Sequence, residues 1–244
     1  MSKTVLITGA SKGIGAATAI HFAQKGYNVV INYNNSYESA SLLARSLASN
    51  GYSVMTHKAN VANKLEVDLM VKETLYKFGS LDILVNNAGV AYQGLITDTD
   101  EIDFDRIIDI NLKGTFNCCK AVASSMVNKG SGKIINISSM WGQVGASCEV
   151  AYSASKSAIE GFTKALAKEL GPSGVTVNCI EPGVINTEMN AELDEATVRE
   201  LCDETPVGKI GDAKELADFI YLIATEKSGF VTGQVIGFDG GFAI

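Results

Sequence analysis

Short runs of β-branched apolar residues alternate along this chain with longer stretches of helical periodicity. Seven such runs, at residues 4–8, 28–32, 53–58, 83–86, 133–137, 175–180 and 234–238, predict seven strands. Strands that alternate with helices are typical of βαβ units, in which parallel strands share one sheet and helices cover both of its faces. The sequence therefore predicts an α/β fold built on one doubly wound, parallel sheet.

The same rhythm argues for a single domain over residues 1–244. Gly26, Gly51 and Gly79 each follow a helical run, as a left-handed residue at a helix end does. No linker rich in Ser, Gly or Pro and no internal repeat interrupts the alternation. Late in the chain the pattern loosens into a polar, acidic stretch, which predicts a substrate lid at about residues 186–210.

Composition excludes several functional classes. The formal net charge is −7, opposite in sign to the field that collects a phosphate backbone, so a nucleic-acid partner is not expected. No stretch approaches the ~20 apolar residues of a membrane span. The five cysteines are odd in number and irregularly spaced, and the two histidines, His21 and His57, are unpaired, so neither a disulfide framework nor a metal site is predicted. We expect a soluble, cytoplasmic protein with reduced thiols.

A glycine-rich loop follows the first predicted strand and leads into a helix expected to start near Ala16. Gly9, Gly13 and Gly15 have the spacing G-x-x-x-G-x-G. Gly9 permits a tight turn, Gly13 lets backbone approach a pyrophosphate, and Gly15 lets the helix pack closely on the strand. The spacing is not that of a P-loop, so a P-loop NTPase is excluded. We predict a dinucleotide site.

The end of the second predicted strand distinguishes the two nicotinamide dinucleotides. A carboxylate there accepts a hydrogen bond from the ribose of NAD and repels the phosphate of NADP. Residues 31–36 contain no Asp or Glu. Lys12, in the glycine-rich loop, supplies a positive charge suited to the additional phosphate. The expected cofactor is therefore NADP (NADPH).

A set of polar residues follows the later strands in an order that suggests chemistry. Asn111 lies in a long predicted helix, Ser139 follows the fifth strand, and Tyr152 and Lys156 are four residues apart. On a helix, this spacing puts both side chains on one face. An ammonium group beside a phenol stabilises the phenolate and lowers the tyrosine pKa from ~10, so the pair could exchange a proton near neutral pH.

With these motifs assembled, the chain resembles the short-chain dehydrogenase/reductase family. The resemblance rests on the glycine-rich loop, Asn86-Asn87-Ala88-Gly89, Asn111, Ser139, Tyr152-x-x-x-Lys156 and Pro182-Gly183 ending in Thr187, in this order from residue 4 to the C-terminus. It implies a Rossmann-type three-layer αβα sandwich with strand order 3-2-1-4-5-6-7. It also implies a homotetramer.

The resemblance assigns roles to individual residues. Tyr152 would donate a proton to the substrate carbonyl oxygen, Ser139 would hydrogen-bond the same oxygen, and Lys156 would bind the nicotinamide ribose. Asn111 would hold a water in the proton path to solvent. The expected cofactor contacts are Gly9, Ser11, Lys12, Gly13, Ile14, Gly15, Asn32, Tyr33, Asn60, Val61, Asn87, Ala88, Gly89, Tyr152, Lys156, Pro182, Gly183, Ile185 and Thr187.

One position departs from the family pattern. Asn60 stands where the family usually has Asp, so any hydrogen bond to the adenine amino group would be uncharged.

Within the family the chain resembles the bacterial 3-oxoacyl-[acyl-carrier-protein] reductases of fatty-acid synthesis, for which an acyl carrier protein is the expected partner. However, Gly171-Pro172-Ser173 occupies the place where these reductases commonly carry a docking arginine.

The segment between Ser139 and Tyr152 should form the substrate wall, and it leaves the substrate open. We expect Ser139, Trp141, Gln143, Glu149 and Tyr152 to contact the substrate. Glu149 would favour a cationic group, so the alternative substrate is an amino-bearing ketone, such as the 5-aminopentanone modification of elongation factor P. Glu149 could instead be a carboxylate that interacts with the dipole at a helix N-terminus. A cofactor sensor without catalysis is disfavoured, because Tyr152 and Lys156 are both present.

Overall fold

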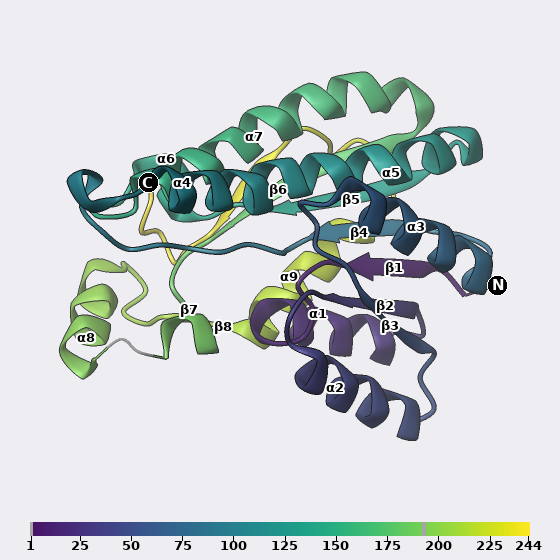
Figure 1. Ribbon diagram of the computed structural model, residues 1–244, viewed down its shortest axis with the longest axis horizontal. Helices are drawn as coiled ribbons and strands as arrows, with labels where there is room; N and C mark the ends of the chain where they lie inside the picture. Colours follow the sequence, from purple (N-terminus) through teal and green to yellow (C-terminus); the bar gives the residue numbers. More distant parts are fainter. Residues whose placement is uncertain (1, 192–193) are drawn as a thin grey trace.

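The computed structural model describes residues 2–191 and 194–244 and has a three-layer αβα architecture (Figure 1). Its main sheet has seven strands in the order β3-β2-β1-β4-β5-β6-β9, and each neighbouring pair is parallel. The strands are β1 (Thr4–Ile7), β2 (Asn28–Tyr33), β3 (Val54–Lys58), β4 (Ile83–Asn86), β5 (Gly132–Ile137), β6 (Val175–Pro182) and β9 (Val235–Phe238). The predicted fold and strand order are confirmed, with β9 as the seventh strand of the sheet.

Helices cover both faces of the sheet because successive strand residues point to opposite sides. Val5 and Ile7 of β1 pack in one core cluster with α1 (Gly13–Gln24), α2 (Tyr37–Ser49) and α9 (Ala213–Ala224). Leu6, between them, packs in the other with α3 (Lys64–Phe78), α5 (Gly114–Lys129) and α7 (Val150–Leu170). Strands buried on both faces explain the continuous apolar runs seen in the sequence.

Most predicted boundaries agree with the structure to within one or two residues. Gly26, Gly51 and Gly79 have φ values of +81°, +83° and +77°, which confirms their left-handed conformation after a helix. The first helix was expected near Ala16 but begins earlier, at Gly13. The helix begins inside the glycine-rich loop, where the residues carry no apolar periodicity, so the apolar pattern cannot reveal its first turn.

A smaller substructure projects beyond the carboxyl ends of the strands. Strands β7 (Ile185–Asn186) and β8 (Gly211–Asp212) form a separate two-stranded parallel sheet that the apolar pattern did not predict. Between them lie the 3-10 turn η4 (Glu188–Asn190) and α8 (Glu195–Glu204), which has no buried residue. The predicted lid, 186–210, spans this excursion, and its residues 192–193 lie outside the described part of the chain.

The remaining elements lie around the same end of the sheet, except the 3-10 turn η3 (Gly171–Ser173), which precedes β6 and therefore lies at the amino ends of the strands. The others are the 3-10 turn η1 (Ile96–Asp98), α4 (Glu101–Ile108), the π-helical turn η2 (Asp109–Lys113) and α6 (Met140–Val144). Among the described residues, no helix combines the length and apolar character needed to cross a membrane.

Candidate active site

The glycine-rich loop between β1 and α1 has the geometry predicted for it. Gly9 and Gly13 have φ values of +61° and +57°, a region that L side chains rarely adopt. A side chain on Gly15 would start 2.6 Å from both the Asn87 Nδ2 atom and the Gly9 carbonyl oxygen. Gly15 therefore lets α1 approach the loop and the end of β4, which is the packing role expected of it.

Three polar side chains hold this loop against the sheet. The Thr8 hydroxyl accepts hydrogen bonds from the backbone N–H groups of Asn87 and Ala88, each at 3.0 Å. Asn87 Nδ2 donates to the carbonyl oxygens of Thr8 (2.9 Å) and Gly9 (3.1 Å). Asn32 Oδ1 accepts from the Gly9 N–H group at 3.1 Å, and Asn32 Nδ2 donates to the Ala59 carbonyl at 3.0 Å. These bonds hold the loop against β2 and β4.

These contacts change how two predicted cofactor residues are interpreted. Asn32 and Asn87 were expected to contact the cofactor, but their side-chain amides are engaged with backbone. Both shape the phosphate loop rather than project freely from it. Tyr33, at the end of β2, is 8% exposed, and its ring lies 5.9 Å from that of Tyr37.

The N-terminus of α1 leaves donors available beside this loop. Lys12 precedes the helix and makes no side-chain capping bond. Among the described residues, no acceptor is found for the N–H groups of Gly13, Ile14 and Gly15. Free N–H groups at a helix N-terminus bind phosphate well, and the exposed Lys12 adds positive charge. Across the loop, Thr187 comes within 3.5 Å of the place where a Gly13 side chain would start.

The segment after β3 lies at the same edge of the sheet. Asn60 Oδ1 accepts a hydrogen bond from the Ala62 N–H group at 3.0 Å, so this oxygen already closes a local turn. Glu66 accepts from the Asn60 N–H group at 2.7 Å. Val61 packs beneath the chain at Gly114, where a side chain would start 2.6 Å from Val61 Cγ2. Asn60 can still offer its second lone pair to an adenine amino group.

Ser139, Tyr152 and Lys156 come together at the carboxyl ends of β5 and β6. Ser139 follows β5 and caps α6, where its hydroxyl accepts from the Trp141 N–H group at 3.2 Å. Tyr152 and Lys156 lie on one face of α7, with the Lys156 Nζ atom 5.4 Å from the tyrosine ring centroid. Lys156 is only 4% exposed, and its ammonium donates to the Ile137 carbonyl oxygen at 2.9 Å.

Burial dominates the protonation of Tyr152 and Lys156. It raises the pKa of Tyr152 to about 12; a side-chain hydrogen bond with Ser139 acts in the opposite direction, and the charge of Glu149 adds to the rise. Burial also lowers the pKa of Lys156 to about 8. The expected lowering of the tyrosine pKa by Lys156 is therefore not found, because the ammonium points to the Ile137 carbonyl.

Asn111 lies in the π-helical turn η2, between α4 and α5, and is fully buried. Its amide binds both backbone groups of Val90: Oδ1 accepts from the N–H group at 2.8 Å and Nδ2 donates to the carbonyl at 2.9 Å. Nδ2 also donates to the Ser155 hydroxyl at 3.0 Å, which ties η2 to α7. A side chain on Gly89 would start 3.3 Å from Asn111 Oδ1 and 3.4 Å from Lys156 Nζ, so both polar atoms face one small space.

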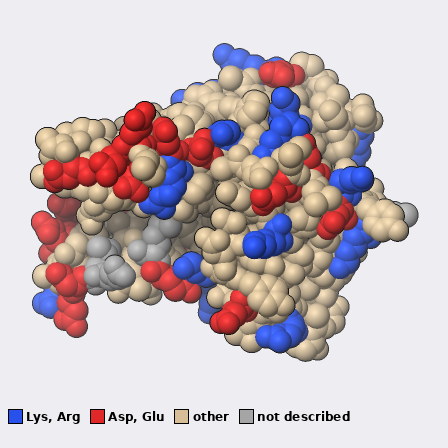
Figure 2. All heavy atoms as spheres, in the orientation of Figure 1, with Lys and Arg blue, Asp and Glu red and all other residues tan. Residues whose placement is uncertain are grey.

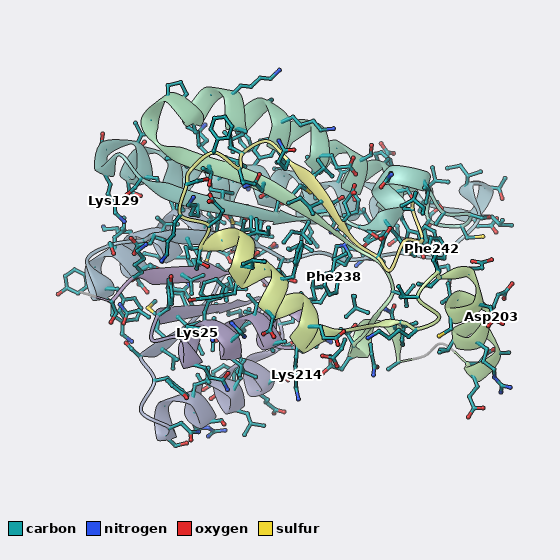
Figure 3. The ribbon with its side chains drawn as sticks, turned by 180° about the vertical axis from the view of Figure 1, so that it is seen from behind. Lys25, Lys129, Asp203, Lys214, Phe238 and Phe242 are labelled. Atoms are coloured by element: carbon teal, nitrogen blue, oxygen red, sulfur yellow. The ribbon has the colours of Figure 1, made fainter. Side chains whose placement is uncertain are left out.

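Trp141, expected to contact the substrate, packs against a residue that the sequence did not suggest. The Trp141 ring packs edge-on against Phe242 of the C-terminal segment, with centroids 5.4 Å apart. Phe242 lies near α6 on the same side of the molecule as Asp203 of α8 (Figure 3). Gln143 is exposed at the rim. Phe242 belongs to no sequence motif, so its contact with Trp141 could not be predicted and follows only from the fold.

Glu149 immediately precedes α7 and lies near Tyr152. Burial raises its pKa, and no salt bridge or side-chain hydrogen bond to it is found within residues 2–191 and 194–244. Its neighbour Cys148 has a φ of +63°, an uncommon conformation for a residue other than glycine, and the Cys148 carbonyl accepts from the Gly94 N–H group at 2.8 Å. The turn that carries Glu149 is thereby joined to the segment that follows β4.

Acidic side chains flank this end of the molecule. Figure 2 shows them gathered over α4 and over α8, on either side of a hollow in the surface. The exposed members are Asp98, Asp100, Glu101, Asp105, Asp194, Glu195, Glu200, Asp203 and Glu204. We call these residues the acidic rim. Its charge favours cationic ligands and partners over anionic ones.

The segment after β6 completes the cluster of predicted cofactor residues. Pro182 ends β6, and Gly183 lies so close to Asp239 that a side chain on it would start 2.8 Å from the Asp239 Cα atom. Ile185 is buried in β7, and Thr187 precedes η4 opposite Gly13. The six strand ends after β1 to β6 therefore bring the predicted site residues to one edge of the sheet.

Comparison with known proteins is consistent with this geometry. Residues 9–243 match the family described as Enoyl-(Acyl carrier protein) reductase. A 3-oxoacyl-[acyl-carrier-protein] reductase FabG of Staphylococcus aureus is 39% identical over 241 residues, covering 99% of this chain and 98% of the relative. The (2S)-[(R)-hydroxy(phenyl)methyl]succinyl-CoA dehydrogenase subunit BbsD of Thauera aromatica is 42% identical, covering 98% and 96%. A gluconate 5-dehydrogenase of Burkholderia cenocepacia, solved with NADP and tartrate, superposes with a TM-score of 0.93 at 34% identity, covering 99% and 96%.

Proposed function

Because this chain belongs to the short-chain dehydrogenase/reductase family, we propose that it is an NADPH-dependent oxidoreductase that reduces a carbonyl to an alcohol. The observation that carries the proposal is the convergence of Ser139, Tyr152 and Lys156 at the carboxyl end of the sheet. We propose that residues 1–244 act as one domain with one such site.

The glycine-rich loop supports NADP as the cofactor. The uncapped N-terminus of α1 offers N–H groups to a pyrophosphate, and the left-handed glycines allow the close approach. Lys12 is exposed beside the loop, and β2 ends without a carboxylate that would repel an additional phosphate. The solved gluconate 5-dehydrogenase with NADP, a structural relative at 34% identity, agrees with this choice.

The bound cofactor would supply a hydride to the carbonyl carbon. Tyr152 donates its proton to the carbonyl oxygen, and the Ser139 hydroxyl donates a hydrogen bond to the same oxygen as negative charge develops on it. Lys156 binds the nicotinamide ribose, which requires its ammonium to exchange the Ile137 carbonyl for ribose hydroxyls. Asn111 and Lys156 face the space beside Gly89, where a water would relay the next proton to Tyr152.

The substrate proposed first is a 3-oxoacyl thioester carried on an acyl carrier protein. Its support is the similarity of the whole chain to reductases with that name. The test is NADPH oxidation with an acetoacetyl carrier-protein thioester, with Tyr152→Phe as the blank. Turnover that disappears in the variant while NADPH binding remains would support the assignment. If the wild type binds NADPH but leaves the thioester unreduced, the carrier-protein substrate is wrong.

An amino-bearing ketone is a second candidate, supported by charge. Glu149 lies near Tyr152 without a cationic partner among the described residues, and the acidic rim flanks the hollow at this end of the molecule. Both would attract an ammonium group and would repel an acidic carrier protein. The similarity to BbsD, whose name specifies a CoA thioester, shows that relatives of this degree differ in substrate.

The variant Glu149→Gln separates the two candidates. For an amino ketone, the loss of the carboxylate should raise KM about tenfold, corresponding to one ion pair of about 1.4 kcal/mol. For an acyl thioester, the same variant should leave KM unchanged or lower it. If Glu149→Gln leaves the KM for an amino ketone unchanged, the amino ketone is wrong; if it raises the KM for an acyl thioester, the acyl thioester is wrong.

We also propose a homotetramer that works in the cytoplasm. Large apolar side chains are exposed on the single chain, including Phe116 at 44%, Ile102 at 81% and Phe230 at 93%, and burial in an assembly would remove them from water. All five cysteines are free thiols, as expected in a reducing compartment. Gly161 of α7 has no atom within 4 Å of the place where its side chain would start. Light scattering on wild type and Gly161→Glu tests whether α7 lies at a subunit interface. If both proteins are tetramers, α7 does not lie at such an interface.

A further inference from the structure

Two glutamates lie close together beneath the proposed active site and have no part in the mechanism above. Glu181 is the penultimate residue of β6, and Glu160 lies in α7, one turn after Lys156. Glu181 is 4% exposed, and its Oε1 atom is buried without a hydrogen-bond partner among the described residues. A carboxylate buried in this way is energetically unfavourable unless its charge is neutralised.

Glu160 and Glu181 can reduce the buried negative charge by sharing one proton between their carboxyl groups. Burial raises the pKa of Glu181 to about 8, and a side-chain hydrogen bond with Glu160 and the charge of Glu160 raise it further. Asp239, after β9, adds to the rise, whereas the Lys164 ammonium of α7 opposes it. One carboxylic acid that donates to one carboxylate is the arrangement that repulsion between two close like charges enforces.

Apart from Lys164, the titratable groups near the pair do not supply a neutralising charge. Cys179 of β6 is a buried thiol whose pKa is raised to about 12, so it is neutral. The Lys156 ammonium is committed to the Ile137 carbonyl. The end of β5 and α6 contribute only the uncharged Ser138 and Gly142. The pair therefore depends on the shared proton to neutralise its buried charge.

The pair lies where three segments of the proposed site meet. Glu160 Oε1 is 3.4 Å from the Ser138 hydroxyl, which donates to the Lys156 carbonyl oxygen at 2.9 Å. A side chain on Gly142 would start 2.5 Å from Glu160 Oε1, so α6 approaches the pair at a position without a side chain. Glu181 directly precedes Pro182. The pair thus touches the segments that carry Ser139, the Tyr152–Lys156 face and the cofactor-binding turn after β6.

We propose that Glu160 and Glu181 are a positioning pair, joined by one shared proton, that holds α7 and the ends of β5 and β6 in the arrangement needed for turnover. When that proton is lost to solvent in alkaline solution, the two carboxylates repel each other and the three segments separate. The inference rests on the proposed reductase function. It concerns positioning, because neither carboxyl group is required to touch substrate or cofactor.

The test compares kcat and KM from pH 6 to 10 for wild type, Glu181→Gln and Glu160→Gln. A glutamine donates an N–H group to the remaining carboxylate at every pH, so it should replace the shared proton. We expect wild-type kcat to fall about tenfold per pH unit once the pair ionises, and both variants to keep their kcat at pH 9. The matched control is Glu169→Gln, an exposed residue of the same helix, which should follow the wild type.

Thermal unfolding against pH gives a second measurement that needs no substrate. Because Glu181 is protonated in the folded protein up to about pH 8 and ionises near 4.5 when unfolded, wild-type stability should fall as the pH rises from 4.5 to 8. Glu181→Gln should not show this loss. If the variants and the wild type share one pH profile of kcat, the positioning role is wrong. This holds even when the thermal unfolding of the wild type shows the expected loss of stability with rising pH. If unfolding follows the expectation and no ketone is reduced by any form, the reductase proposal fails instead.

Discussion

Asn32→Ala tests whether the phosphate loop is held by side-chain bonds to backbone. The substitution removes the acceptor of the Gly9 N–H group (3.1 Å) and the donor to the Ala59 carbonyl (3.0 Å). Asn32 is 2% exposed and Ala59 is 1% exposed, so water cannot readily replace the lost amide there. An unsatisfied buried polar group costs about 1–3 kcal/mol. Since Gly9 is only half-buried, we expect a loss of about 2–4 kcal/mol in the free energy of unfolding.

The assay is denaturant unfolding together with a fluorescence titration of NADPH. NADPH affinity should fall with stability, because the unpinned loop must be reordered on binding. The control is Asn50→Ala: Asn50 donates to the Ser46 carbonyl at 2.8 Å in an exposed position, and its loss should cost about 0.5 kcal/mol or less. A loss below about 1 kcal/mol for Asn32→Ala, or unchanged NADPH affinity in a destabilised variant, would refute the reasoning.

Two further predictions concern protonation. Burial alone would raise the pKa of Asp82, but hydrogen bonds from Lys129, Thr4 and Ser80 hold it below its ordinary value of 3.8, so this carboxylate stabilises the fold above that pH. Asp82→Asn should therefore be less stable than the wild type at pH 7, with the difference shrinking as the pH falls below about 4; a constant difference in urea unfolding would contradict this. Because burial lowers the pKa of Lys156 to about 8, binding of the anionic NADPH at pH 8.5, with its ribose hydroxyls at the amine, should take up a fraction of a proton. Calorimetry in buffers of different ionisation enthalpy measures this uptake, and Lys156→Met should lack it.

The polar motifs of the proposed site could be predicted because they follow strand ends. Parallel strands bring their carboxyl ends to one edge, so the sequence places Ser139 after β5 and Pro182 at the end of β6 at the same edge without any knowledge of packing. The spacing of Tyr152 and Lys156 fixes a shared helix face in the same way. The roles of these residues in catalysis stay a proposal, but their proximity was accessible from the sequence.

Side-chain orientation was not accessible in this way. The amide of Asn32, a predicted cofactor contact, turns to the Gly9 and Ala59 backbone, because these groups have no other hydrogen-bond partner among the described residues. A contact between Asn32 and the cofactor stays a prediction. Lys156 was expected to depress the tyrosine pKa, yet burial raises that pKa to about 12 while the ammonium binds the Ile137 carbonyl. Local pattern reports which residues share an edge, but competition for hydrogen bonds decides which way each side chain points.

Apolar periodicity and strand-end position are local properties, so the parallel sheet, its strands and the edge at which polar residues gather could be predicted from the amino-acid order alone. Contacts between residues of distant segments follow only from the folded chain. Phe242 packs on Trp141, and Glu160 of α7 meets Glu181 of β6, although no motif links either pair in the sequence. The physical reason is that burial and the neighbours it imposes are set by how helices pack on the sheet, and these neighbours determine charge, protonation and orientation.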